Sequence, residues 1–335
     1  MKILISSHAF APSIGGIETV SRLLAQEFVA RGHEVTVITQ TTGESAEKFS
    51  VVRRPPLGEL FGLINWCDIF WQNNLSLRTL WPVALRPRPV VVTHQGSYCL
   101  RPTGFDGALR LKRAVVRRLT GVAISQFVAN CLDGHSAVIP NPYDARVFTD
   151  ASPGAERSGE LLFVGRLVSE KGLDLLLEAL SLLRKRELHP SLTIVGTGPE
   201  LEVMQKLAGD LGLRGQVNFA GGQRGEELAR TFHAHRVLVV PSRYDEPFGV
   251  VALEGIACGC AVAGSAGGGL PEAMGPCGLS FPNGDAGALA DALEKLLREP
   301  GARDRLRAQA PQHLAHFHPA AIADQYLDLF RSKLP

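Results

Sequence analysis

The sequence lacks several features that would place it in other classes of protein. No apolar run approaches the about 20 residues that a membrane-spanning helix needs. The chain starts with a strand-like segment, Lys2 to Ser7, rather than with a signal peptide. The formal net charge is only +2, which gives no sign of nucleic-acid binding. We therefore expect a cytoplasmic protein that binds no nucleic acid.

Metal-binding patterns are also missing. The 6 cysteines are scattered, and Cys258 and Cys260 lack the spacing of a zinc pair, so we expect reduced, buried thiols. His313, His316 and His318 lie in a tail without an acidic or cysteine partner, and no D-x-D motif occurs in the chain. The sequence therefore predicts no metal site.

The G-x-G-x-x-G turn of dinucleotide-binding proteins is absent after the first predicted strand. Gly15 and Gly16 are adjacent there, and Pro12 precedes them. Such an excursion does not fit a tight dinucleotide turn, so a dehydrogenase is disfavoured. We interpret Gly15 and Gly16 as backbone that comes close to a ligand, with an ordinary pair of loop glycines as the alternative.

The chain has 335 residues, of which 45% are hydrophobic and 20% charged, and this is long enough for two domains. Short apolar segments alternate with amphipathic helical segments, as in parallel sheets covered on both faces. A linker composition at residues 150–159 separates two such series. Strands are predicted at Lys2 to Ser7, Glu34 to Thr39, Ile69 to Trp71, Val90 to His94, Val122 to Ser125, Ala137 to Ile139, Leu161 to Val164, Leu192 to Val195 and Val237 to Val240, and helices at Ile17 to Ala30 and Leu173 to Leu183.

Two carboxylates, Glu246 and Glu254, bracket a turn and the start of a predicted helix just after a strand. Ligands of open α/β sheets bind at such strand ends. The first turn of the helix, at Phe248, Gly249 and Val250, has free N–H groups that attract phosphate. Carboxylates bind paired hydroxyls well, as ribose or hexose recognition requires. The alternative is a solvated acidic loop followed by a surface glutamate.

Two further loops follow predicted strands and precede helices. Gly165, Arg166 and Lys171 follow the strand at Leu161 to Val164, and their loop is predicted to be exposed. The two cations suit a pyrophosphate, although surface charge beside a glycine turn is the alternative. The third loop contains Gly196 and Gly198 and leads into a helix with Pro199 in its first turn.

The segments VGRLVSEKG, GTGPE and EPFGVVALEGIACGCAVAGSAGGGLPEA resemble the retaining glycosyltransferases of family 4, which have the GT-B fold. The resemblance implies two Rossmann-like α/β domains that face each other across a cleft. Residues 1–150 would form the acceptor-side domain, on which a C-terminal helix at about 319–335 would pack. Residues 151–318 would form the domain that binds the nucleotide-sugar donor.

The resemblance also implies a reaction and roles for residues. A hexosyl group would move from a nucleotide diphosphate sugar, most commonly a UDP-sugar, with retention at the anomeric carbon. Arg166 and Lys171 would stabilise the leaving phosphate without a cofactor or divalent metal, Glu254 would hold the ribose, and Glu246 would hold the sugar hydroxyls. Gly267, Gly268 and Gly269 would let the backbone approach the sugar or phosphate.

In the N-terminal half, the family places a histidine near the reacting carbon, and His94 matches that position at a strand end. His8 also follows a strand. Asn141 resembles an interdomain Pro-Asn-Gly segment, with Pro142 in place of the glycine. A structural histidine at either position is the alternative.

The acceptor is the part of the reaction that the sequence defines least, and we expect a glycan, glycolipid or lipid-linked molecule. A basic amphipathic segment at Arg110 to Arg118 could dock on anionic lipid, which predicts peripheral contact with the inner face of the membrane. A solvated helix face is the alternative. Other functions on the same fold also stay open, namely a nucleotide-sugar epimerase, a phosphorylase, or a non-catalytic nucleotide-sugar binding module.

Overall fold

The computed structural model describes residues 1–334 except 14, 97–114, 116, 133–135 and 151–156. The chain forms two compact units. Unit 1 consists of Met1–Pro142 with Phe317–Pro335, and unit 2 is Tyr143–His316. The division lies between Pro142 and Tyr143, a few residues before the position at 150 that the sequence suggests.

Unit 1 contains a sheet of 7 strands in the order β3-β2-β1-β4-β5-β6-β7, and all neighbouring strands are parallel. The order reverses between β1 and β4, which therefore flank a topological switch point. Its elements are β1 (Lys2–Ser7), α1 (Gly16–Ala30), β2 (Glu34–Thr39), β3 (Ser50–Arg53), α2 (Leu57–Trp66), β4 (Ile69–Asn73), α3 (Leu77–Leu80), η1 (Trp81–Ala84), β5 (Val90–His94), β6 (Thr120–Ala123), α5 (Gln126–Asn130), β7 (Ser136–Val138) and α14 (Pro319–Arg331).

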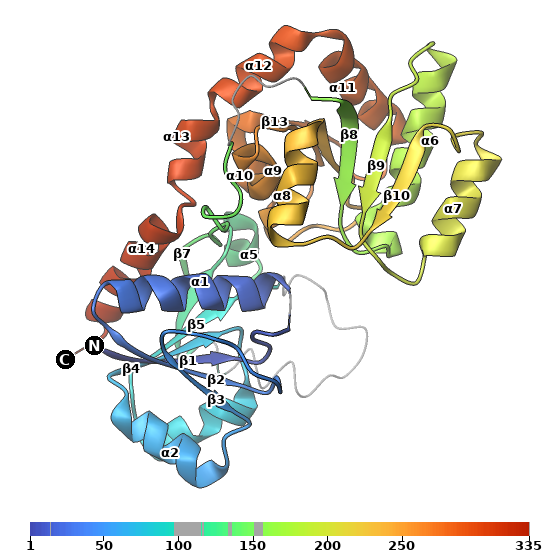
Figure 1. Ribbon diagram of the computed structural model, residues 1–335. Helices are drawn as coiled ribbons and strands as arrows, with labels where there is room; N and C mark the ends of the chain where they lie inside the picture. The colour runs from blue at the N-terminus through green and yellow to red at the C-terminus, as the bar shows by residue number, and fades with distance from the viewer. Residues whose placement is uncertain (14, 97–114, 116, 133–135, 151–156, 335) are drawn as a thin grey trace. The chain divides into compact units, whose positions relative to one another are not determined.

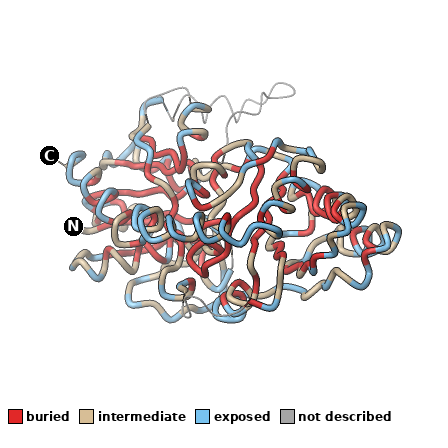
Figure 2. The backbone as a smooth tube through the Cα atoms, turned by 90° about the horizontal axis from the view of Figure 1, so that it is seen from above, coloured by how far each residue is buried: buried red, intermediate tan, exposed pale blue. Residues whose placement is uncertain are grey.

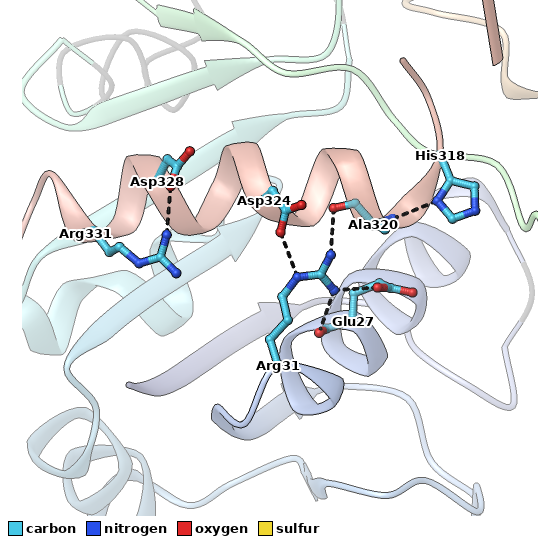
Figure 3. Close-up of polar contacts among 7 residues, drawn as sticks. All are labelled: Glu27, Arg31, His318, Ala320, Asp324, Asp328 and Arg331. Atoms are coloured by element: carbon cyan, nitrogen blue, oxygen red, sulfur yellow. Dashed lines mark hydrogen bonds and ion pairs between the residues drawn. The ribbon is translucent and has the colours of Figure 1, made fainter. Parts of the chain in front are cut away.

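The last helix, α14, completes the core of unit 1 by packing beside α1. Its Tyr326 and Phe330 are buried against Trp71 of β4, and the Tyr326 hydroxyl lies 2.8 Å from Thr93 Oγ1. On the outer side, Arg31 at the end of α1 pairs with Asp324 of α14 at 2.7 Å (Figure 3). An apolar interior and a polar margin together attach the C-terminal helix to the N-terminal sheet.

Unit 2 contains a parallel sheet of 6 strands in the order β10-β9-β8-β11-β12-β13. Here the switch point lies between β8 and β11. Strands β8, β9 and β10, on one side of it, lie next to one another in Figure 1. Its elements are β8 (Gly159–Val164), η2 (Ser169–Lys171), α6 (Leu173–Lys185), β9 (Leu192–Val195), α7 (Leu201–Asp210), β10 (Val217–Gly221), α8 (Gly225–Ala234), β11 (His235–Val240), α9 (Val250–Ala257), β12 (Ala261–Ser265), α10 (Leu270–Met274), η3 (Gly275–Cys277), β13 (Gly278–Phe281), α11 (Ala286–Arg298), α12 (Pro300–Ala308) and α13 (Ala310–Ala315).

The core of unit 2 forms because the central parts of its inner strands are apolar and the helices that cover them carry one apolar face. Leu176, Leu180 and Leu183 of α6 are fully buried against Leu161 and Val239 of the sheet. Most strands contain buried residues, with β3, β7 and β10 as exceptions, and Figure 2 shows buried stretches of the chain inside and exposed stretches toward the outside. Strand ends and the loops that follow them are therefore the places where polar side chains reach a surface.

Candidate functional site

The loops that follow β8 and β11 lie side by side at the switch point of unit 2. The Arg243 backbone N–H donates to the Glu170 carbonyl at 2.9 Å. Gly172 has a φ of 66°, and a Cβ there would lie 2.0 Å from the Pro241 carbonyl oxygen. Arg243 also pairs with Asp174 of α6 at 2.6 Å. Only glycine allows this close approach, which brings the side chains of the two loops together.

Lys171 and Glu246 meet in this place. Lys171 Nζ lies 2.6 Å from Glu246 Oε1, and the side chains are 23% and 8% exposed. The sequence predicted an exposed loop around Lys171, which is wrong for this side chain because Glu246 draws it inward. A buried carboxylate needs a cation or several hydrogen bonds. The ion pair therefore fixes the positions of both side chains and balances the charge of the buried Glu246 carboxylate.

Ser242 and Tyr244 also hold Glu246, and sequence analysis missed both. The Ser242 hydroxyl donates to Glu246 Oε1 at 2.6 Å, and the Tyr244 hydroxyl donates to Oε2 at 2.5 Å. Burial and the Glu246 charge raise the pKa of Tyr244, while the Arg166 charge acts in the opposite direction. Tyr244 therefore stays a proton donor to the carboxylate. Their positions two and four residues before Glu246 were the available signal.

Gly267, Gly268 and Gly269 support the Glu246 loop from the other side. Gly268 has a φ of 73°, and a Cβ there would lie 2.2 Å from the Glu246 carbonyl oxygen. The Gly269 N–H donates to that same oxygen at 2.6 Å. A Cβ on Gly267 would meet Asp245 Oδ1 at 2.3 Å. Packing within the protein thus favours glycine at positions 267 and 268, whatever further role the three glycines have toward a ligand.

Helix α9 begins where the Glu246 loop ends. Gly249 precedes its first residue, Val250, with a φ of 109°, and Phe248 is buried beside it. Glu254 follows just over one turn later and is partly exposed. Desolvation and the nearby Asp144 charge raise the pKa of Glu254 to about 8. A carboxyl group and the N-terminus of a helix thus lie on one element, as the sequence predicted.

The two glycine-containing loops after β8 and β9 are hydrogen-bonded to each other. Gly165 N–H donates to the Val195 carbonyl at 3.0 Å, and Leu167 N–H to the Thr197 carbonyl at 2.9 Å. A Cβ on Gly196 would lie 1.8 Å from the Gly165 carbonyl oxygen, and one on Gly198 would lie 2.3 Å from that of Leu167. Close packing of the two loops therefore explains the small residues.

Arg166 in the loop after β8 and Pro199 in the loop after β9 were both singled out in the sequence. Arg166 is exposed, so its guanidinium is accessible to a ligand. Pro199 precedes α7, whose first residue is Leu201. The prediction that Pro199 lies in the first helical turn is therefore wrong by two residues.

The predicted residues of unit 1 lie at the strand ends of its own sheet. His94 ends β5 and is fully buried, and desolvation lowers its pKa to about 4. Its imidazole is therefore neutral near pH 7. Asn141 is buried and exchanges two hydrogen bonds with Gln95, at 2.8 and 3.1 Å. His8 follows β1 and is exposed.

Gly15 and Gly16 precede and begin α1. Gly15 has an extended φ of −177°, and a Cβ there would lie 2.6 Å from Glu18 Oε2. Among the described residues, none has an atom within 4 Å of a Cβ built on Gly16. Gly15 thus gives room to the Glu18 carboxylate, while no described residue requires a glycine at position 16.

The remaining predictions fall partly outside the described residues. Most of the basic segment, including Arg110 and Arg113, lies there, and Arg117 and Arg118 are exposed. Among the helices that the structure describes, none combines the length and apolar character needed to cross a bilayer.

Most of the described cysteines are buried, and two of the tail histidines form hydrogen bonds with backbone groups. Four cysteines are free and buried: Cys67, Cys258, Cys260 and Cys277. Cys131 is disulfide-bonded, so the expectation of reduced thiols is wrong at that position. His313 Nε2 lies 2.8 Å from the Ala273 carbonyl oxygen, and His318 Nδ1 accepts from the Ala320 N–H. In the part of the chain that the structure describes, no cluster of three potential metal ligands occurs.

Two family models match the chain in succession. "Glycosyltransferase Family 4" matches residues 14–147, and "Glycosyl transferases group 1" matches residues 148–313. A D-inositol 3-phosphate glycosyltransferase of Corynebacterium jeikeium is 35% identical over 64% of this chain and 57% of its own length. The chain therefore spans little more than half of that relative.

Two further comparisons extend over nearly the whole chain. A GDP-mannose-dependent alpha-(1-6)-phosphatidylinositol monomannoside mannosyltransferase of Mycolicibacterium smegmatis is 29% identical over 89% of this chain and 90% of its own length. The structure of sucrose-phosphate synthase from Thermosynechococcus elongatus has a TM-score of 0.81 at 24% identity, covering 99% of this chain and 98% of that one. The sequence matches and the two parallel-sheet units agree, and the chain belongs to glycosyltransferase family 4, with the GT-B fold.

Proposed function

We propose that the protein transfers a hexosyl group from a nucleoside diphosphate sugar to a hydroxyl group of an acceptor, with retention at the anomeric carbon. The observation that carries this proposal is the cluster at the switch point of unit 2. There, Lys171, Glu246 and the start of α9 lie together, and Glu254 follows on the same helix. A cation, a helix N-terminus and two carboxyl groups are what a diphosphate with hydroxyl-bearing groups at both ends requires.

Each of these groups has a role in the proposed reaction. Arg166, Lys171 and the N–H groups at Gly249 and Val250 stabilise negative charge that develops on the leaving phosphate, a contribution on the order of several kcal/mol in a site without water. Glu254 accepts hydrogen bonds from the ribose. Glu246 accepts them from the transferred sugar, and Ser242 and Tyr244 keep its carboxylate in place.

His94 has a different role in this proposal from that of a general acid. A pKa of about 4 leaves the imidazole without a positive charge at neutral pH. With its side chain fully buried, it would hold the end of β5 in place as a neutral imidazole rather than transfer a proton. Activity should then not follow the titration of a histidine near pH 6.5.

Two bases are candidates for the nucleotide. Uridine is the most common in the family, and the relative that covers 89% of this chain is named as GDP-mannose-dependent. We propose that the reaction needs neither a cofactor nor a divalent metal, because the sequence lacks D-x-D and protein cations are available at the loop after β8.

The acceptor in this proposal is a glycan, a glycolipid or another lipid-linked molecule of the cell envelope. The chain would act in the cytoplasm, with the basic segment from Arg110 to Arg118 in contact with the inner face of the membrane. Sedimentation with anionic vesicles tests this contact, and binding should weaken when Arg117 and Arg118 are both changed to Ala. Equal sedimentation of both proteins would contradict it.

The reaction itself is tested with UDP-glucose and GDP-mannose in the presence of EDTA. Nuclear magnetic resonance of the sugar anomeric proton reports both cleavage and configuration. The proposal expects release of one nucleoside diphosphate and an α-configured product from the α-configured sugar. Sugar conversion without nucleotide release would indicate an epimerase, and a strict need for inorganic phosphate would indicate a phosphorylase. Binding without any turnover would indicate a binding module.

A further inference from the structure

Asn283 lies just beyond the end of β13, at the carboxyl edge of the unit 2 sheet. Strands β12 and β13 are paired in parallel as far as Ser265 and Phe281. The same register, continued by two residues, places Asn283 opposite Gly267. A side chain at this position can therefore reach the loop that carries Glu246.

The Asn283 amide links two loops in the way that a peptide group would. Its Oδ1 accepts a hydrogen bond from the Gly267 N–H at 2.8 Å, and its Nδ2 donates to the Tyr244 carbonyl at 3.5 Å. A backbone N–H can only donate and a carbonyl can only accept, so these two partners fix the orientation of the amide. The same two loops also meet in a parallel bridge between Glu246 and Gly268, and the amide extends that pairing by one step.

Glycine at position 267 makes room for this amide. A Cβ on Gly267 would lie 2.4 Å from Asn283 Nδ2 and 2.3 Å from Asp245 Oδ1. Both atoms therefore occupy the space that a side chain would take, and the Asn283 amide lies close to the Asp245 carboxylate. A neutral amide tolerates this neighbour, whereas a second carboxylate would be repelled by it.

The segment between β13 and α11 holds Asn283 in place. The Asp285 N–H donates to the Pro282 carbonyl at 3.2 Å, which closes a turn around Asn283. Asp285 Oδ1 in turn accepts from the Ala288 N–H at 2.8 Å and caps the first turn of α11. Because Asn283 lies between a paired strand and a capped helix, its amide has a fixed position from which to hold the two loops.

The loop that Asn283 holds brings Tyr244 and Glu246 into the cluster at the switch point. The Tyr244 hydroxyl donates to Glu246 Oε2 at 2.5 Å and lies 3.3 Å from Lys171 Nζ. From the other side, the Gly269 N–H donates to the Glu246 carbonyl at 2.6 Å. Asn283 therefore acts on both supports of Glu246, the backbone of Tyr244 and the glycine segment.

The groups proposed to bind the nucleotide belong to a different element. They are Glu254 and the N–H groups at the start of α9, and among the described residues the hydrogen bonds of Asn283 go to Gly267 and Tyr244 instead. A change at Asn283 should therefore displace Glu246 and leave the nucleotide contacts in place.

We propose that Asn283 is a positioning residue of this cluster and that it sets the selectivity for the transferred hexosyl group. It acts through Tyr244 and Gly267 on the Glu246 carboxylate rather than by contact with the sugar. The inference rests on the proposed function, in which Glu246 accepts hydrogen bonds from the sugar hydroxyls. Epimeric sugars differ in the direction of one hydroxyl group, so the position of such a carboxylate determines which epimer is accepted.

Steady-state turnover and calorimetric binding on the full chain test this role with Asn283→Ala. The KM for the accepted sugar nucleotide should rise about tenfold, as expected for the loss of one or two hydrogen bonds. The preference for that donor over an epimer (UDP-glucose over UDP-galactose, or GDP-mannose over GDP-glucose) should fall by a similar factor. The Kd of UDP or GDP should stay that of the wild type, which a general loss of structure in unit 2 would not allow.

Asn283→Asp separates the two hydrogen bonds at nearly constant shape. The introduced carboxylate can still accept from the Gly267 N–H, but it cannot donate to the Tyr244 carbonyl and it lies beside Asp245. Selectivity should therefore fall as in Asn283→Ala. Adding Asp245→Asn should recover part of the loss, since the neighbouring charge is removed, and no recovery would contradict the assigned geometry.

Asn218→Ala is the matched control, because Asn218 is an exposed asparagine on β10 of the same unit, and it should leave KM and selectivity unchanged. Wild-type KM and selectivity in both Asn283 variants would overturn the inference. Equal weakening of nucleoside diphosphate and sugar nucleotide binding would overturn it as well. If the wild type turns over no sugar nucleotide at all, the proposed function falls, and the inference falls with it.

Discussion

Replacing Lys171 by Ala should destabilise unit 2 as well as slow the reaction. The substitution removes the cation that lies 2.6 Å from Glu246 Oε1. Glu246 keeps the hydroxyl groups of Ser242 and Tyr244 as partners, but it becomes a buried carboxylate without a counter-charge. The result is a cost in the free energy of unfolding that an exposed lysine would not give.

The size of this cost follows from the exposure of the two side chains. Removing one partner of a fully buried pair costs about 3–5 kcal/mol, whereas an exposed pair contributes about 0–1 kcal/mol. Lys171 is 23% and Glu246 8% exposed, so we expect a loss between these limits, about 2 kcal/mol. For a unit of this size, that corresponds to a decrease in Tm of about 4–8 °C. Turnover should fall at least about 100-fold, because a charge near the leaving phosphate is lost.

Differential scanning calorimetry and turnover assays on three variants measure both effects. Arg186→Ala is the matched control, because its pairs with Asp291 and Glu294 are more exposed, and it should lower the Tm much less than Lys171→Ala does. Adding Glu246→Gln to Lys171→Ala should recover part of the lost Tm, since the unpaired charge is removed. The reasoning is refuted if Lys171→Ala has the Tm of the wild type, or if the second substitution lowers the Tm further.

Three further predictions concern single residues. The carboxyl of Glu254 has a folded pKa of about 8, above its unfolded value; its contribution to stability is therefore present at low pH and is lost as pH rises from about 4.5 to 8, by at most about 1.4 kcal/mol per pH unit. The Tm of Glu254→Gln should accordingly rise relative to the wild type between pH 5 and 8, and parallel Tm curves would contradict this. His94 has a folded pKa of about 4, below its unfolded value, so the unfolded chain binds the proton first and stability falls by about 2 kcal/mol from pH 6.5 to 5. His94→Gln should reduce this acid-induced fall in Tm, and an unchanged acid response would argue against it. Gly249→Ala combines a φ of 109° with a Cβ that would lie 2.6 Å from Leu270 Cδ1, so urea unfolding should show a loss of about 1–3 kcal/mol, and wild-type stability would show that the turn relaxes.

The sequence predicts the strands best where an apolar run ends sharply. The strands β1, β2, β5 and β9 have the predicted bounds, and a polar residue or a glycine follows each of them. Strand β4 extends beyond Trp71 to Asn73, since Gln72 and Asn73 are buried polar residues that find hydrogen-bond partners only in the folded unit. A pattern based on hydrophobicity cannot include them.

Strands at or near the sheet edges escaped prediction for a related reason. β3 (Ser50–Arg53) and β10 (Val217–Gly221) contain no buried residue, so their apolar signal is weak. β12 consists of alanine, valine, glycine and serine and is fully buried. Its small side chains are explained by the close packing of α10, since a Cβ on Gly264 would lie 2.3 Å from the sulfur of Met274.

The candidate site was predictable in its charges but not in its contacts. Strand-end position predicted that Lys171 and Glu246 lie at one sheet edge, and the two side chains meet there; Glu254 follows on α9. The pairing of Lys171 with Glu246 depends on the path of two loops, which is set by contacts such as that between Gly172 and the Pro241 carbonyl. The same holds for the two hydrogen bonds between Gln95 and Asn141, because hydrogen bonds between residues far apart in sequence leave no periodic pattern.

The most direct test of the central claim is the Tm of the full chain in EDTA with UDP, GDP, ADP or NAD. A ligand at 100 times its Kd adds about 2.7 kcal/mol, which corresponds to a shift of about 5–10 °C for a unit of this size. We predict such a shift with one nucleoside diphosphate and none with NAD, and a smaller shift in Glu254→Ala. A shift with NAD alone, or no shift with any nucleoside diphosphate, would contradict the claim that unit 2 binds the diphosphate of a nucleotide sugar without a metal.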